Sequence, residues 1–111
     1  MMDLFTVRRL EKILDGYIEL KVPHNVRSSV RLVYEWDGDL LTLCERRPAY
    51  PEREWSRANI AQFRLESGSW RVYAKQEDGS FQPVSSIVPD PDFERQLEQV
   101  ELDAEGLFWI S

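Results

Sequence analysis

The segment SVRLVYEWDGDLLTLCE, residues 29–45, decides the fold, because its large apolar residues alternate with other residues. A period of two is typical of a β-strand with one buried face. Asp37-Gly38 divides the segment and is a strong signal for a two-residue type I′ turn. The segment therefore predicts a β-hairpin whose apolar side chains share one face. Its predicted cross-strand pairs are Trp36–Asp39, Tyr34–Leu41 and Leu32–Leu43.

A second hairpin is predicted by the same reasoning from IAQFRLESGSWRVYA, residues 60–74. A turn at Ser67-Gly68 again gathers the apolar side chains on one face. On the other face, Arg64 lies opposite Arg71, and like charges in that position destabilise a sheet. The remaining predicted pairs are Leu65–Trp70, Phe63–Val72, Ala61–Ala74 and Gln62–Tyr73.

The two ends of the chain predict helices. Apolar residues recur with helical spacing over Asp3–Lys21, and Pro23 ends that pattern. Near the other end, Asp90 is the predicted N-cap of a helix that ends at Gly106. The terminus after this helix, with Phe108-Trp109, is so apolar that it folds back onto the core or meets a partner.

Together these elements predict a single α+β domain spanning residues 1–111. Asp78-Gly79 predicts a third reversal, which leads into a short edge strand at 81–84. The sheet is then an antiparallel meander of about five strands. An apolar sheet face needs a cover, so the N-terminal and the C-terminal helix are expected to pack together on one face.

Composition predicts a globular protein, with 42% hydrophobic and 31% charged residues among 111. No apolar run approaches the roughly 20 residues that cross a bilayer, and the N-terminus does not resemble a signal peptide. A single cysteine, Cys44, excludes an internal disulfide and favours a reducing compartment. We therefore expect a cytoplasmic protein that has no membrane partner.

Charge is distributed unevenly along the chain, whose net charge is −6. Residues 41–75 carry seven basic and four acidic side chains, whereas residues 76–111 carry one basic and nine acidic ones. The overall acidity counts against generic nucleic-acid binding. A local basic face still acts within a Debye length of about 10 Å.

Spaced aromatic and arginine residues form a further pattern in the chain: Cys44-x-x-Arg47-Pro48, Tyr50, Trp55, Ile60-Ala61-x-Phe63-Arg64, Trp70, Tyr73 and Phe108-Trp109. This pattern resembles an uncharacterised family of small bacterial proteins, the domain of unknown function 3024. The chain departs from the family pattern at Tyr50 and Ala74, where tryptophan is usual, and at Val84, where a late aromatic is usual. The resemblance implies no activity.

Catalytic and metal chemistry find little support in the sequence. Nothing in the sequence brings the base His24 to Cys44, and these two residues do not complete a zinc ligand set. The paired carboxylates fit turn and cap positions, and no glycine-rich phosphate loop is present. We therefore expect no enzyme activity and no cofactor.

The arginines of the middle segment have two interpretations. They form an ion-pair lattice with the acidic C-terminal segment, or they form an exposed recognition face. Arginine and aromatic residues are enriched at interface hot spots. The candidate binding residues are Arg47, Tyr50, Trp55, Arg57, Arg64, Arg71 and Tyr73. Of these, Trp55 is expected in a Pro- and Glu-containing loop that precedes the hairpin of residues 60–74.

The favoured function is a non-enzymatic module that recognises an acidic segment of a protein partner. The alternative is a single-stranded nucleic-acid-binding protein that stacks bases on Trp55 and Tyr50. A small-substrate enzyme is the third class, and it requires an activated Cys44 or a pocket with perturbed carboxylates.

Overall fold

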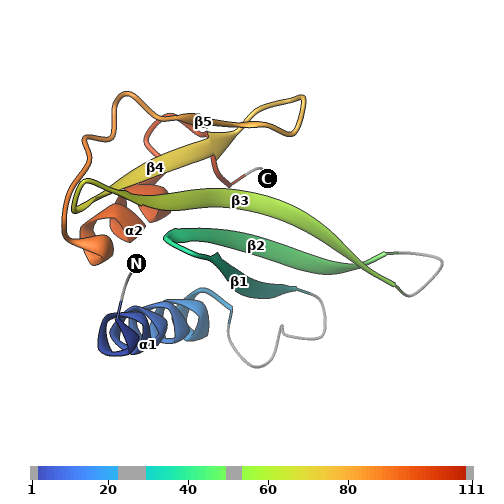
Figure 1. Cartoon of the computed structure of the whole chain (residues 1–111). Coiled ribbons are helices and arrows are strands. Elements are labelled where there is room, and N and C mark those ends of the chain that lie inside the picture. The colour runs from blue at the N-terminus through green and yellow to red at the C-terminus, as the bar shows by residue number, and fades with distance from the viewer. Residues whose placement is uncertain (1–2, 23–29, 50–53, 110–111) are drawn as a thin grey trace.

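The structure, a computed structural model, describes residues 3–22, 30–49 and 54–109, and for residues 48–49 and 54–56 it describes the backbone alone. Five antiparallel strands lie in sequence order in one open sheet, with a helix at each end of the chain (Figure 1). The predicted α+β meander is confirmed. The elements are α1 (Leu4–Lys21), β1 (Arg31–Asp37), β2 (Leu40–Ala49), β3 (Glu54–Glu66), β4 (Ser69–Lys75), β5 (Phe81–Pro83) and α2 (Phe93–Leu102).

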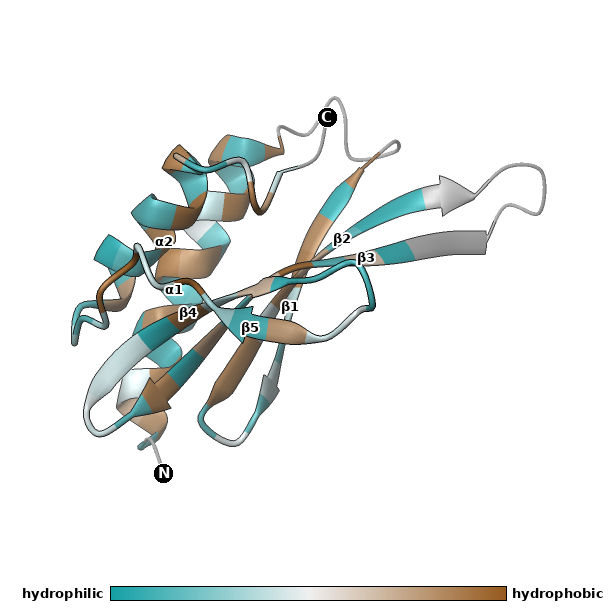
Figure 2. Cartoon of the chain, turned by 90° about the horizontal axis from the view of Figure 1, so that it is seen from above, coloured by the Kyte–Doolittle hydropathy of each residue, from teal (hydrophilic) through white to brown (hydrophobic). Residues whose placement is uncertain are grey.

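Both helices lie on the same side of the sheet (Figure 2). Their apolar stripes meet the apolar face of the strands, where the Phe93 ring of α2 lies 5.0 Å from Phe63 and 5.2 Å from Trp70. One continuous core results, as alternation along the strands predicts. Its most deeply buried members are Leu14, Leu41, Leu43, Ala61, Phe63, Val72 and Val100.

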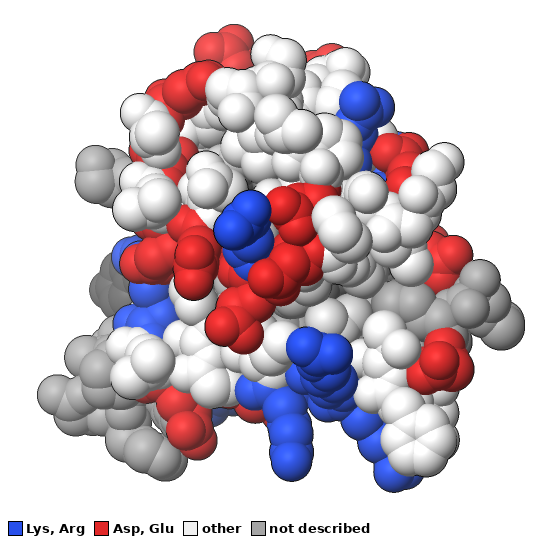
Figure 3. Space-filling view, turned by 90° about the vertical axis from the view of Figure 1, so that its left-hand side faces the viewer, with Lys and Arg blue, Asp and Glu red and all other residues white. Residues whose placement is uncertain are grey.

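Helix α1 begins as its sequence predicts. The Asp3 carboxylate caps it by accepting a hydrogen bond from the Thr6 amide at 2.8 Å. Further along, the Tyr17 hydroxyl and the Lys21 ammonium both donate to Glu101 of α2. Polar contacts therefore join the two helices on the same side of the sheet. Acidic groups gather over α2 in Figure 3, and basic groups lie below them over α1.

The first hairpin differs from its predicted register. Trp36 pairs with Leu41 and Tyr34 with Leu43, because the two-residue loop is Gly38-Asp39 and not Asp37-Gly38. Gly38 alone of the loop residues has positive φ, 61°, which is the sign pattern of a type II′ turn. The loop lies one residue later in the sequence than predicted, so every cross-strand partner is two residues later than predicted. The predicted division of side chains between the two faces is therefore preserved.

The second hairpin has the predicted register in full. Arg64 pairs with Arg71, Gln62 with Tyr73, and Ala61 with Ala74. Both turn residues have positive φ, 52° at Ser67 and 78° at Gly68. These signs are those of a type I′ turn, whose twist matches that of the flanking strands.

Strand β3 begins earlier than its sequence suggests. Residues 54–59, expected in a loop, pair with the end of β2, and the register shifts between Leu43 and Cys44 of β2. The shift leaves Ile60 as the extra residue of a β-bulge. Ile60 and its neighbour Ala61 are both buried in the core.

Helix α2 is shorter at both ends than predicted. The N-cap is Asp92 and not Asp90, because the Asp90 backbone is held in a β-bridge with Trp70. The helix ends at Leu102, with Asp103 in the left-handed conformation, and not at Gly106.

The C-terminal segment folds back onto its own core. The Asp103 carboxylate accepts hydrogen bonds from the amides of Leu107, Phe108 and Trp109, at 2.7, 3.2 and 3.0 Å. Phe108 is buried, and the Trp109 indole donates to the Val100 carbonyl. Of the two expectations for this terminus, folding back onto the core is the one that the buried Phe108 supports. None of the helices in the described part of the chain is both long and apolar enough to span a bilayer.

Candidate functional site

The side of the sheet opposite the helices carries polar side chains. Alternation along β1–β4 directs to this side the residues that lie between the core positions. We call this surface the open face, because no described helix lies over it (Figure 2). Its principal residues are Glu35, Thr42, Cys44, Arg46, Arg57, Asn59, Gln62, Arg64, Arg71 and Tyr73.

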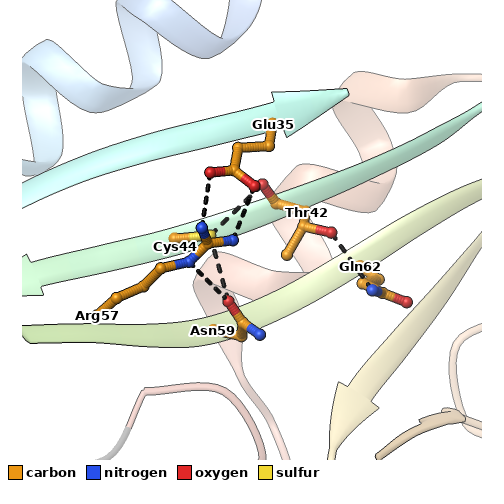
Figure 4. Close-up of polar contacts among 6 residues, drawn as sticks. All are labelled: Glu35, Thr42, Cys44, Arg57, Asn59 and Gln62. Atoms are coloured by element: carbon orange, nitrogen blue, oxygen red, sulfur yellow. Dashed lines mark hydrogen bonds and ion pairs between the residues drawn. The ribbon is translucent and has the colours of Figure 1, made fainter. Parts of the chain in front are cut away.

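Arg57 anchors one polar cluster on the open face, built from β1, β2 and β3 (Figure 4). Its guanidinium donates to both carboxylate oxygens of Glu35, at 2.6 and 2.9 Å. Its Nε also donates to Asn59 Oδ1 at 3.3 Å. Bidentate geometry makes this pair specific, but both side chains are exposed, so it adds less than about 1 kcal/mol to stability.

Cys44 lies beneath this cluster and is fully buried. Its thiol donates to Asn59 Oδ1 at 3.3 Å. Burial raises the pKa of the Cys44 thiol, and the nearby Arg57 guanidinium only partly opposes that rise. A thiol in this state lacks the thiolate character of a nucleophile. The base considered for it, His24, lies outside the described residues.

A second cluster surrounds the cross-strand arginine pair. The Arg64 guanidinium lies 3.9 Å above the Tyr73 ring and donates to Gln62 Oε1 at 3.0 Å. The Tyr73 hydroxyl in turn donates to Glu66, 3.3 Å from each carboxylate oxygen. Arg64 Nε is buried and has no hydrogen-bond partner, and Arg71 is exposed.

The predicted ion-pair lattice with the C-terminal acidic segment does not form among the described residues. Helix α2 lies on the other side of the sheet, where its Glu101 pairs with Lys21. Arg95, within the same acidic segment, contacts Asp90 at 3.4 Å. In the described part of the chain, neither Arg64 nor Arg71 forms an ion pair.

The structure places the candidate binding residues in different positions. Arg57, Arg64, Arg71 and Tyr73 share the open face, although Tyr73 is only 7% exposed beneath Arg64. Arg47 does not join them, since alternation in β2 directs it to the helix side, where it pairs with Glu45.

Two further candidates have less structural description. Tyr50 lies outside the described residues. Trp55, expected in a loop, is a strand residue whose backbone pairs with Pro48, and its side chain is not described.

Sequence reasoning missed Arg46 as a member of the open face. It pairs with Arg31 of β1 and with Arg57 of β3, so arginines occupy one row across three strands. The available signal was alternation, since Arg46 lies two residues after Cys44. Using it required β2 to extend beyond Glu45 and β3 to begin before Ile60.

Metal binding has no geometric support in residues 3–22, 30–49 and 54–109. No group of three or more His, Cys, Asp or Glu side chains there is arranged to hold an ion. The open face presents mainly guanidinium groups and amides, beside a covered phenol ring, a hydroxyl and the Glu35 carboxylate that Arg57 already pairs. Such a set binds carboxylate or phosphate oxygens through hydrogen bonds and charge.

The fold and the open face define a class: a two-layer α+β protein with two helices on one side of an antiparallel sheet and a basic surface on the other. The family model of the domain of unknown function DUF3024 matches residues 2–110, so the chain belongs to that family. A search of curated proteins and a search of solved structures each found no match.

Proposed function

We propose that this protein is a non-enzymatic, cytoplasmic binding module that recognises an acidic segment of a protein partner through the arginines of its open face. One observation carries the proposal: Arg64 and Arg71 face each other across β3 and β4, and neither forms an ion pair within the described chain. A bound anion removes the repulsion between them.

The hydrogen-bonding capacity of this pair supports the proposal. A guanidinium has five N–H donors, of which Arg64 uses one on Gln62 and has a second, at Nε, buried in the protein, so the donors for a ligand are those of its terminal nitrogens. Stacking on Tyr73 fixes the plane of the Arg64 guanidinium, which lowers the entropy lost when a carboxylate binds. Arg71 is exposed beside it. Two neighbouring carboxylates of an acidic segment match this arrangement.

The state of Tyr73 favours a protein segment over single-stranded nucleic acid. Nucleic-acid platforms on sheets stack bases on exposed aromatic rings. Here Tyr73 is 7% exposed, and the Arg64 guanidinium already covers its ring. A base must displace that contact before it stacks, whereas a carboxylate binds at the outer edge of the guanidinium.

The test measures binding of a fluorescent oligoglutamate peptide by anisotropy. We expect the double substitution Arg64→Gln and Arg71→Gln to weaken binding roughly tenfold or more, because charge-assisted hydrogen bonds are lost. The matched control is Arg8→Gln with Arg9→Gln, which removes the same charge from exposed positions of α1. Equal loss in both variants would show a nonspecific charge effect and contradict the proposal.

The nucleic-acid alternative is tested in the same assay with an oligothymidylate of matched charge. Tighter binding of that probe than of oligoglutamate, with a steep dependence on salt, would assign the open face to nucleic acid and overturn the proposal.

A further inference from the structure

Strand β3 extends well beyond the strand that pairs with its outer edge. Ladder pairs with β4 run from Ala61 to Glu66, whereas β3 starts at Glu54. Figure 1 shows β2 and β3 continuing together beyond the ends of their neighbours. On the β4 side, residues 54–59 therefore have no ladder partner among the described residues.

In the part of the chain that the structure describes, no strand occupies this position in the plane of the sheet. Strand β4 ends at Lys75 and turns back, with the Gln76 amide donating to the Ser80 carbonyl at 2.7 Å. A further strand in line with β4 would lie beside residues 54–59 of β3. Unpaired backbone groups along such an edge are the template on which an extended segment adds as a strand.

A groove of about 470 Å³ follows this edge on the helix side of the sheet. Ala58 and Ile60 of β3 line it together with Leu107 and Phe108 of the C-terminal segment. Charged groups of both signs are also in the lining, including Lys75 and Glu77. Side chains of an added strand that point to the helix side meet the apolar part of this groove, which is rimmed by polar and charged groups.

The other side of the same edge is basic. Arg57 lies on the open face of β3, and Arg46 lies beside it on β2. Glu35 is the acidic side chain that contacts Arg57 there, and Arg46 forms no ion pair in the described part of the chain. Side chains of an added strand that point to this side meet guanidinium groups. Alternation thus gives the two faces of an added strand different chemical requirements.

We propose that an extended protein segment with alternating acidic and apolar residues adds as a strand to the edge of β3 at residues 54–59, with its acidic side chains toward Arg57 and Arg46. This inference rests on the proposed function, since it names the conformation in which the acidic partner binds. Backbone hydrogen bonds supply affinity, and the alternating side chains supply specificity.

A second copy of this chain fits the edge less well. Antiparallel pairing of residues 54–59 with themselves across a two-fold axis brings the Arg57 side chains of both copies to neighbouring positions. Like charges so placed on a sheet destabilise the pairing. Charge therefore favours an acidic partner strand over self-association.

The experiment uses the full chain and an alternating Glu-Val peptide long enough to span residues 54–59. Two analogues serve as controls. The first keeps the composition but has all its Glu residues in a single block, and the second keeps the charge but has N-methylated backbone amides. We expect each analogue to bind roughly tenfold or more weakly than the parent, because the first lacks alternation and the second lacks backbone donors. Hydrogen exchange should slow at residues 54–59 on binding of the parent and stay unchanged in α1.

The outcomes separate this inference from the function on which it rests. Equal binding of all three peptides, with no added protection at residues 54–59, would overturn strand addition and leave acidic recognition standing. If none of the three peptides binds, at concentrations at which the Glu-Val peptide saturates a generic basic protein, both strand addition and acidic recognition are overturned. A chain that is dimeric and protects residues 54–59 without peptide would assign the edge to a second copy.

Discussion

The two faces of the sheet are made by the same strands, yet they have opposite chemistry. Phe63 is fully buried under α2, whereas its neighbours in sequence, Gln62 and Arg64, lie on the open face and are only partly buried. Burial of a large apolar side chain contributes about 1.5–3 kcal/mol. The facing arginines cost only tenths of a kcal/mol. The helix side thus supplies stability, and the open face is free to carry charges that the fold does not need.

The sharpest test of this difference compares two adjacent residues of β3. We expect Phe63→Ala to lower the free energy of unfolding by about 3–5 kcal/mol, because it leaves a cavity between the sheet and α2. The matched change on the open face, Gln62→Ala, should cost less than about 1 kcal/mol, since it removes partly exposed hydrogen bonds. Denaturant titration measures both values. Similar losses would mean that the open face is also a core.

The two hairpins show which parts of the fold are predictable from sequence. Alternation predicts both hairpins, and in both the predicted division of residues between faces is correct. Only the second register is correct: both of its loop residues, Ser67 and Gly68, have positive φ as the predicted type I′ turn requires, whereas in the first loop Gly38 alone does. In the first hairpin, Asp37-Gly38 and Gly38-Asp39 give the same division of faces, so alternation does not distinguish the two loops.

Gln96 is a polar exception on the helix side. It is 1% exposed, and its amide donates to the carbonyls of Trp70 at 2.7 Å and Val88 at 3.0 Å. Gln96→Leu keeps the volume and removes both hydrogen bonds, so we expect a loss of about 1–2 kcal/mol in thermal or denaturant unfolding. The control Gln99→Leu, on the same helix but only partly buried, should change stability by less than about 0.5 kcal/mol. If Gln96→Leu does not change the free energy of unfolding, the Trp70 and Val88 carbonyls must accept hydrogen bonds from water instead.

The candidate site was less predictable than the fold. Arg64 and Arg71 face each other as predicted, because they lie within the hairpin whose register is predicted correctly. Arg47 is a predicted site residue although it lies on the helix side, and Arg46 of the open face is missed, because the sequence predicts a loop and not a strand for the Pro- and Glu-containing stretch after them. Pairing with β2 overrides that local composition, and the bulge at Ile60 has no sequence signal that alternation detects.

Alkaline pH should weaken the attachment of α1 to the helix side of the sheet. Burial, together with the hydrogen bond to Asp15 of α1, raises the pKa of Tyr34 from 10.0 to about 12. Because the pKa is higher in the folded state than in the unfolded state, the protonated Tyr34 contributes fully to stability below pH 10. The fold loses that contribution as the pH rises from 10.0 to about 12. The wild-type chain should therefore lose more stability over this window than Tyr34→Phe does. Denaturant titrations of both proteins at each end of the window measure the difference, and parallel losses would contradict it.

The smallest expected effect concerns the arginine pair, and its sign is informative. Arg71→Gln removes a like-charge contact with Arg64, so we expect it to stabilise the fold by about 0.2–0.5 kcal/mol at low salt and by less in high salt, where charges are screened. The control Arg9→Gln, on exposed α1, reports the effect of net charge alone. If Arg71→Gln instead destabilises the fold more than the control does, Arg71 has a structural role and the open face is not spare surface. A substitution that raises stability while it weakens peptide binding is the behaviour expected of a residue kept for recognition.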